Sequence, residues 1–103
     1  MNVHYNEHNY KYLIVLTELM DVAKIILRKL YRRRIIGGKH TAVEHLTKGL
    51  PKHVVGSAKE VVKELIKEGF ILPKKTSYGL QVSLNPEKID EITRIIEDGS
   101  GSS

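Results

Sequence analysis

The sequence predicts a mainly α-helical fold with one small β-hairpin, and three observations support this class. Apolar residues recur at helical spacing over a long N-terminal stretch and over two later segments. Residues 80–84 instead alternate between apolar and polar side chains, which is the spacing of a half-buried strand. Glycine and proline separate these segments. With 103 residues, 41% of them hydrophobic, the chain has the size of one domain with a modest core.

A long helix is expected from Asn9 to Arg34, and Gly37 with Gly38 ends that region, as glycine commonly does. Its apolar residues form two neighbouring stripes, which are together wider than a small domain needs from one helix. We therefore expect a homodimer through this helix, since symmetric pairs are the commonest oligomers. The alternative is that the helix only backs the core along its length. The stripes contain Leu13, Leu16, Met20, Ala23, Leu27 and Tyr31, and Val15, Leu19, Val22, Ile26 and Leu30.

Two shorter helices are expected next, each begun by a capping box in which a hydroxyl and a carboxylate cap each other's backbone N–H groups. Thr41–Glu44 fits the first box, and Gly49 closes that short helix. Ser57–Glu60 fits the second box, so the third helix is expected over Ser57–Glu68. Gly69 is placed as its C-terminal cap.

The period changes after residue 69. Phe70–Leu72 is expected as a short strand, residues 73–79 as a turn, and Leu80–Leu84 as the second strand of a hairpin. Asn85 then serves as the N-cap of a last helix that has Pro86 in its first turn. The apolar face of this helix consists of Ile89, Ile92, Ile95 and Ile96.

These elements define one domain over residues 9–98. Residues 1–8 are polar and expected to be flexible, and residues 99–103 have the Gly-Ser composition of a linker or tag. The absence of cysteine excludes disulfides and thiolate metal sites. The most apolar stretch, Leu13–Leu30, carries five charged side chains, so no membrane span is expected. Without a secretory segment, the chain fits the cytoplasm.

No metal, other cofactor or enzymatic activity is expected. His4 and His8 are four residues apart, as two metal ligands on a helix could be, but no carboxylate pattern accompanies them. The other three histidines follow no recognisable ligand spacing. The sequence contains no nucleophile–base motif of a catalytic site.

Positive charge is concentrated in one part of the chain. The net charge is +5, but residues 28–53 alone carry a net charge of +7. A basic block of this density predicts a polyanionic partner, of which nucleic acid is the commonest. The alternative for part of the block is that Arg and Lys near a helix C-terminus are favoured by the helix dipole without any ligand.

The order long helix, short helix, helix, hairpin, helix resembles the winged-helix (winged helix-turn-helix) superfamily. The resemblance covers roughly residues 10–97, with the helix-turn-helix and hairpin in 41–98, and includes the run Glu68-Gly69-Phe70-Ile71, where a helix stop passes directly into a strand. The composition, rich in Lys and Ile and free of cysteine, also looks like that of small archaeal DNA-binding proteins. The resemblance implies a protein that binds double-stranded DNA and regulates transcription.

In winged-helix proteins the third helix usually enters the major groove, and the wing usually touches the backbone or the minor groove. Carried onto this chain, the resemblance implies groove-facing residues on the third helix and phosphate contacts from the wing. The basic block adds further backbone contacts. The third helix supplies Ser57, Lys59, Lys63 and Lys67, the wing Lys74, Lys75, Thr76, Ser77 and Tyr78, and the block Arg32, Arg33, Arg34, Lys39, His40, Lys52 and His53.

One feature departs from this pattern, because Glu60, Glu64 and Glu68 interleave with the lysines of the third helix. Carboxylates repel phosphates, and this helix has no Arg, Asn or Gln for a bidentate base contact. The same residues could instead form a solvated face with Glu–Lys pairs. Two other functions therefore stay open: a protein-interaction module within a larger assembly, and RNA binding through Arg28–Lys39.

Overall fold

The computed structural model describes the backbone of residues 7–101 and the side chains of residues 18–97. His4 and the side chain of His8 lie outside this part of the chain, as does most of the predicted flexible segment. The fold is mainly helical with a small three-stranded antiparallel sheet, which confirms the predicted class. The elements are α1 (Glu7–Arg32), β1 (Thr41–Ala42), α2 (Val43–Thr47), α3 (Lys52–Lys67), β2 (Ile71–Thr76), β3 (Gly79–Leu84), the 3-10 helix η1 (Pro86–Lys88) and α4 (Ile89–Gly101).

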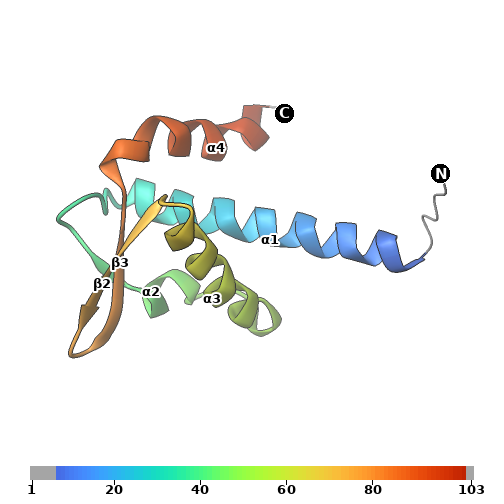
Figure 1. The fold of residues 1–103 in the computed structure, drawn as a ribbon, viewed down its shortest axis with the longest axis horizontal. Helices are drawn as coiled ribbons and strands as arrows, with labels where there is room; N and C mark the ends of the chain where they lie inside the picture. The colour runs from blue at the N-terminus through green and yellow to red at the C-terminus, as the bar shows by residue number, and fades with distance from the viewer. Residues whose placement is uncertain (1–6, 102–103) are drawn as a thin grey trace.

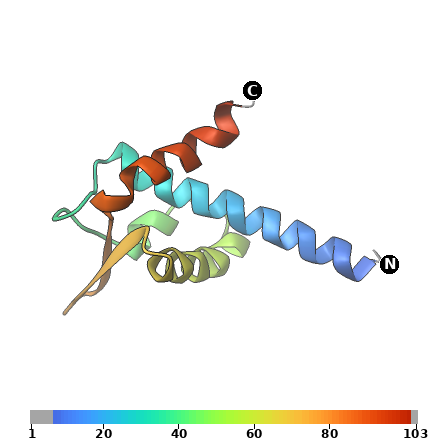
Figure 2. The same cartoon turned by 45° about the horizontal axis from the view of Figure 1, so that its top comes forward.

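α1 is the central layer of the molecule. Figure 1 shows α4 on one side of α1, and α2, α3 and the sheet on the other side. The described part of the chain is elongated, with extents of 49 × 30 × 24 Å. The N-terminal half of α1 extends past α3 and α4 in both Figure 1 and Figure 2. A helix of 26 residues is roughly 39 Å long, so α1 spans most of the long axis.

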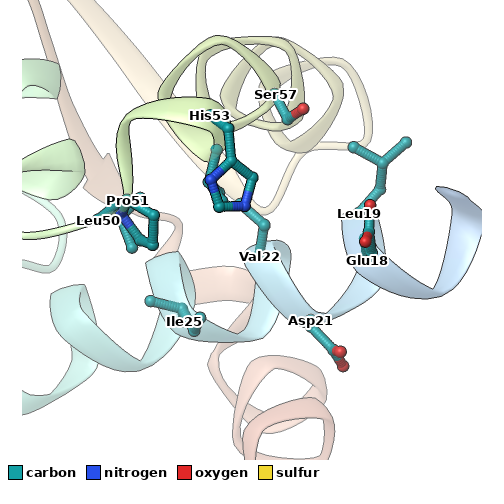
Figure 3. Close-up of a pocket in the computed structure, with 10 residues that line it drawn as sticks. Glu18, Leu19, Asp21, Val22, Ile25, Leu50, Pro51, His53 and Ser57 are labelled. Carbon is teal, nitrogen blue, oxygen red and sulfur yellow. The ribbon is translucent and has the colours of Figure 1, made fainter.

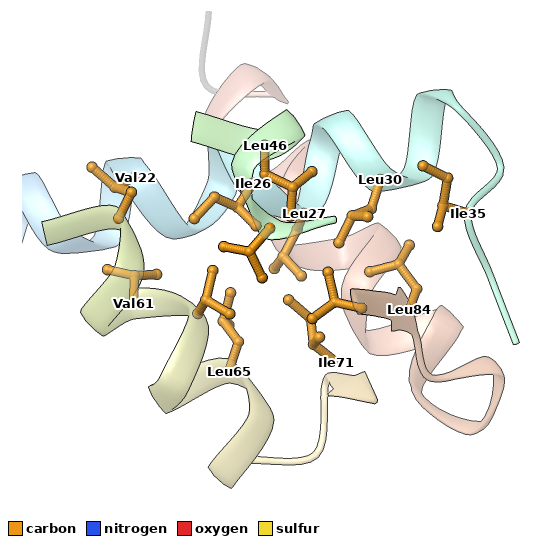
Figure 4. Packing of buried hydrophobic residues seen from close by; sticks show 14 of the residues in the cluster. Val22, Ile26, Leu27, Leu30, Ile35, Leu46, Val61, Leu65, Ile71 and Leu84 are labelled. Atoms are coloured by element: carbon orange, nitrogen blue, oxygen red, sulfur yellow. The ribbon is translucent and has the colours of Figure 1, made fainter. Parts of the chain in front are cut away.

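The hydrophobic core lies around the C-terminal half of α1 (Figure 4). Both predicted stripes contribute, since Val22, Ile26 and Leu30 come from one and Leu27 from the other. Met20 of the same helix is 64% exposed, so the first stripe is not covered over its whole length. The other elements close the core with Leu46, Val61, Val62, Leu65, Ile71, Val82, Leu84, Ile92 and Ile96.

The long helix was predicted to run to Arg34, with Gly37 and Gly38 ending the region, and its C-terminal cap lies earlier than these glycines. α1 ends at Arg32, and Arg34 adopts the left-handed conformation with φ 56°. The N–H of Arg34 donates to the carbonyl of Tyr31 at 3.0 Å, and the N–H of Ile35 donates to that of Leu30 at 2.9 Å. This is the hydrogen-bond pattern of a Schellman C-cap, in which glycine usually occupies the left-handed position.

The predicted capping box at Thr41–Glu44 is wrong, because Thr41 belongs to a strand. Thr41 pairs with Val82 as part of β1, the third strand that the sequence analysis did not predict. α2 begins after Ala42 without a side-chain cap. The hydroxyl oxygen of Thr41 instead lies 3.1 Å from Nδ1 of His45.

The predicted start of the third helix at Ser57 is also wrong. α3 begins at Lys52 with Pro51 as its N-cap residue, so Ser57 lies inside the helix and caps nothing. The half-buried Leu50 and Val54 pack against the core, which continues the apolar face of α3 upstream. Burial of this first turn therefore outweighs the local Ser-x-x-Glu signal.

The end of α3 follows the prediction. Gly69 has φ 84°, a conformation that glycine adopts without steric cost. The N–H of Phe70 donates to the carbonyl of Leu65 at 2.9 Å, and that of Gly69 donates to Ile66 at 3.0 Å. This is a second Schellman motif, and it leads the chain directly into β2.

The hairpin is longer than predicted, since β2 runs to Thr76 and only Ser77 and Tyr78 lie between the strands. Residues 73–75 were predicted as part of the turn because of their Pro-Lys-Lys sequence. Pro73 is tolerated in β2 because this strand lies at the edge of the sheet, in the order β1-β3-β2. Gly79, at φ 115°, returns the chain into β3.

The beginning of the last helical segment confirms the prediction. The side-chain oxygen of Asn85 accepts a hydrogen bond from the N–H of Glu87 at 3.0 Å, with Pro86 in the first turn. The amide nitrogen of Asn85 also donates to the carbonyl of Gly69 at 2.8 Å, which ties this turn to the end of α3. α4 continues to Gly101, past the boundary predicted at residue 98.

Candidate nucleic-acid interface

Three of the lysines of α3 lie along one edge of the helix, apart from its glutamates. With about 100° between successive residues, Lys52, Lys59 and Lys63 fall within about 40° of one another. All three are exposed, and we refer to them as the lysine edge. Glu60 and Glu64 lie farther round the helix, although they alternate with lysines along the sequence. Helical geometry thus separates these three lysines from the glutamates, whereas Lys67 lies about 20° from Glu60.

The position of the two glutamates confirms this separation. Glu60 and Glu64 line a hollow of about 210 Å³ together with Met20 and Ala23 of α1. The glutamates therefore lie on the side of α3 that faces the N-terminal half of α1, and the lysine edge lies away from it. One ion pair joins the lysine edge to the glutamates, Lys63 to Glu60 at 3.3 Å. With side chains 72% and 70% exposed, this pair contributes little stability.

The β2–β3 hairpin carries a second exposed basic group. Lys74 and Lys75 are exposed on the edge strand and lie on opposite faces of the sheet, as neighbours in a strand do. Tyr78 at the turn is 94% exposed. The turn is fixed by Thr76, whose hydroxyl donates to the carbonyl of Gly79 at 2.9 Å and accepts from the N–H of Tyr78 at 3.1 Å. Figure 1 shows this turn and the first turn of α3 on the side of the molecule away from α4.

The basic residues at the end of α1 and in the loop that follows it lie away from the hairpin turn. Arg32, Arg33 and Arg34 are exposed, and the following loop with Lys39 and His40 passes the base of the sheet. There the N–H of Gly37 donates to the carbonyl of Leu84 at 3.0 Å, at the end of β3 farthest from the hairpin turn. β3 has six residues, so its end at Leu84 and its end at the hairpin turn are roughly 17 Å apart. The structure therefore does not bring these arginines together with the hairpin turn.

Two members of the basic block have internal partners. Arg28 donates from Nη2 to the carbonyl of Ile96 at 2.9 Å, which ties α1 to α4. Lys29 donates from Nζ to the carbonyls of Leu46 at 3.0 Å and Lys48 at 3.1 Å, at the end of α2. Part of the charge concentration in the sequence therefore has a structural role.

His53 and Ser57 face α1 and not the lysine edge. Both line a hollow of about 310 Å³ between α1 and the start of α3, whose remaining lining is mostly apolar (Figure 3). In that view the ring of His53 points toward α1. The resemblance placed Ser57 and Lys59 on one groove-facing surface, whereas the structure places them on different sides of the helix.

The placement of Lys52, Lys59 and Lys63 on one edge of α3 was not predicted, although the sequence contains the signal. The helical period places these lysines together when it is applied to the charged residues as well as to the apolar ones. The residues that the sequence singled out on α3 and the hairpin are exposed where expected, apart from Ser57 and Thr76, which are half-buried.

Within residues 18–97 no three histidine, aspartate or glutamate side chains gather as a metal site would need. In the described chain, no helix combines the length and the apolar character needed to cross a bilayer. The comparisons of this chain with protein-family models, curated proteins and solved structures find no match.

Proposed function

We propose that this chain is a winged-helix protein that binds double-stranded DNA through α3 and the β2–β3 hairpin, as a transcriptional regulator does. The observation that carries the proposal is the lysine edge of α3. It is exposed, and of its three lysines Lys63 is paired with Glu60, while Lys52 and Lys59 form no ion pair with another described residue. Lysines arranged in this way can contact successive phosphates, and Lys52 and Lys59 can do so without an ion-paired carboxylate beside them.

The topology supports the same proposal. Two helices joined by a short turn precede a hairpin, and β1, which leads directly into α2, pairs with β3. This pairing holds the hairpin beside the helix pair, so that it can serve as the wing. We also propose that two copies of the chain associate through α1 and bind DNA as a dimer, because symmetric dimers read paired half-sites on DNA.

The contacts that we propose are with the DNA backbone. The lysine edge contains no Arg, Asn or Gln, which are the residues that make bidentate contacts with base edges. Binding should therefore depend weakly on base sequence and strongly on salt. Arg32, Arg33, Arg34 and Lys39 would contact phosphates farther along the duplex from the loop at the base of the sheet.

The test is a titration of duplex DNA at several salt concentrations. Each phosphate contact contributes about 0.9 to the slope of log K against log salt. Replacing Lys59→Gln should lower the slope by roughly that amount and weaken binding to all duplex sequences alike. Arg94→Gln is the matched control, since it removes one exposed positive charge from α4, on the opposite side of α1.

The outcomes distinguish the candidate functions. A flat titration at low salt, or equal losses for the two variants, would contradict DNA binding by α3. Stronger competition by duplex RNA than by duplex DNA would instead favour RNA as the partner.

A further inference from the structure

α1 presents an apolar surface that the rest of the described chain leaves uncovered. Met20 is 64% exposed, and the neighbouring Leu19 and Ala23 are half-buried. Leu19 lines both hollows between α1 and α3, of about 210 and 310 Å³. The smaller one is lined by Leu19, Met20 and Ala23 of α1 and by Glu60, Val61, Glu64 and Leu65 of α3. An exposed apolar surface of this kind is typical of a protein interface.

We infer that this surface, which we call the α1–α3 surface, binds the N-terminal half of α1 from a second copy of the chain. Residues 12–16 read Tyr-Leu-Ile-Val-Leu, and the backbone of α1 is helical there and extends past α3 and α4. A helix segment that is apolar on all sides requires burial on more than one side. Each copy thus offers both a protruding apolar helix and a surface that can hold one, as a two-fold dimer requires.

The spacing of the apolar residues indicates which positions of the two α1 helices meet. Leu13, Leu16, Met20 and Ala23 are separated by three, four and three residues, which is the spacing of a coiled-coil seam. In two antiparallel α1 helices that cross near residue 18, position 16 of each copy falls opposite position 20 of the other, and position 13 opposite position 23.

The antiparallel direction follows from the position of the globular part. The C-terminal half of α1 is buried in its own core. A parallel pair would bring both cores to the same end of the helices, where they would collide. An antiparallel pair puts them at opposite ends and lays each protruding half on the partner's α1–α3 surface.

The size of a stable interface sets how the partner must lie. A stable interface buries about 800 Å² per partner. Residues 12–16 are five consecutive apolar residues of a helix and therefore face all round it. The partner must cover more than one side of this segment, which contact with α1 and α3 together provides.

The inference rests on the proposed pairing through α1 and does not depend on DNA binding. Its test is the molar mass in solution over a range of concentrations, by sedimentation. The wild-type chain should have the mass of a dimer, and Met20→Glu that of a monomer. Because Met20 is exposed, the variant should retain the helical circular dichroism of the monomer fold. Tyr78→Glu is the control, since it replaces a more exposed apolar side chain at the hairpin turn and should stay dimeric.

Cross-linking tests whether Met20 lies at the interface between the two copies. The chain has no cysteine, so Met20→Cys carries a single thiol. A short bis-maleimide should convert Met20→Cys into a covalent dimer and leave Tyr78→Cys uncoupled. A wild-type chain that stays monomeric at high concentration overturns the inference, as does a dimer that survives Met20→Glu. Either result could be found with DNA binding intact, so this failure is distinguishable from failure of the proposed function.

Discussion

At the scale of single residues, Arg34 is the position where the backbone is strained. Its φ of 56° is the only positive value among the described non-glycine residues, and it caps α1 where glycine is usual. We expect Arg34→Gly to raise the free energy of unfolding by up to about 1 kcal/mol, because the left-handed conformation then carries no steric cost. Arg34→Ala removes the same charge but keeps the Cβ atom, so it should give no gain. Thermal unfolding of both variants checks this, and equal stabilities would show that Arg34 is not strained.

At the scale of elements, α2 depends on its neighbours. Five residues are too few for a helix that is stable by itself, and Lys29 donates to the carbonyls of Leu46 and Lys48 at its end. We expect Lys29→Met to cost about 1–3 kcal/mol, since it leaves two carbonyls without this charged donor. Hydrogen exchange should then accelerate first in residues 43–50. Lys24→Met is the matched control on the same helix, and an equal effect of both replacements would assign the loss to charge alone.

At the scale of the whole molecule, the protruding half of α1 links stability to association. If a second copy covers it, unfolding and dissociation are coupled, and the midpoint of thermal unfolding should rise with protein concentration. Each tenfold increase in concentration adds about 1.4 kcal/mol to the stability of a dimer. The midpoint of Met20→Glu should not depend on concentration. Calorimetry over a hundredfold range of concentration measures both, and a wild-type midpoint that does not move would contradict the coupling.

The sequence predictions were correct where neighbouring residues decide the local structure, and wrong where tertiary contacts outweigh the local signal. Gly69 and Asn85 were placed correctly because a left-handed cap and an N-cap are decided by a few neighbouring residues. The capping boxes at Thr41 and Ser57 failed because tertiary contacts were stronger. Pairing with Val82 draws Thr41 into a strand, and packing of the first turn of α3 places Ser57 inside the helix.

In the candidate site, too, the features decided by local sequence were predicted correctly, and those decided by tertiary contacts were not. The exposure of Lys59, Lys63, Lys74 and Lys75 followed from the sequence, because charged side chains of amphipathic elements face water. The internal role of Lys29 could not be foreseen, since its acceptors lie on a helix that only the fold brings near.

By itself, the sequence determined the mainly helical class, the apolar faces of the long helices and the C-terminal ends of α3 and of the hairpin strand β3. These follow from periodicity and from the conformational preferences of single residues, which act over a few positions. The tertiary structure alone decided the third strand, the true start of α3 and which side of α3 faces the N-terminal half of α1. It also decided which basic residues hold the fold together and which stay exposed. These features depend on contacts between residues far apart in the chain, and no local pattern encodes such contacts.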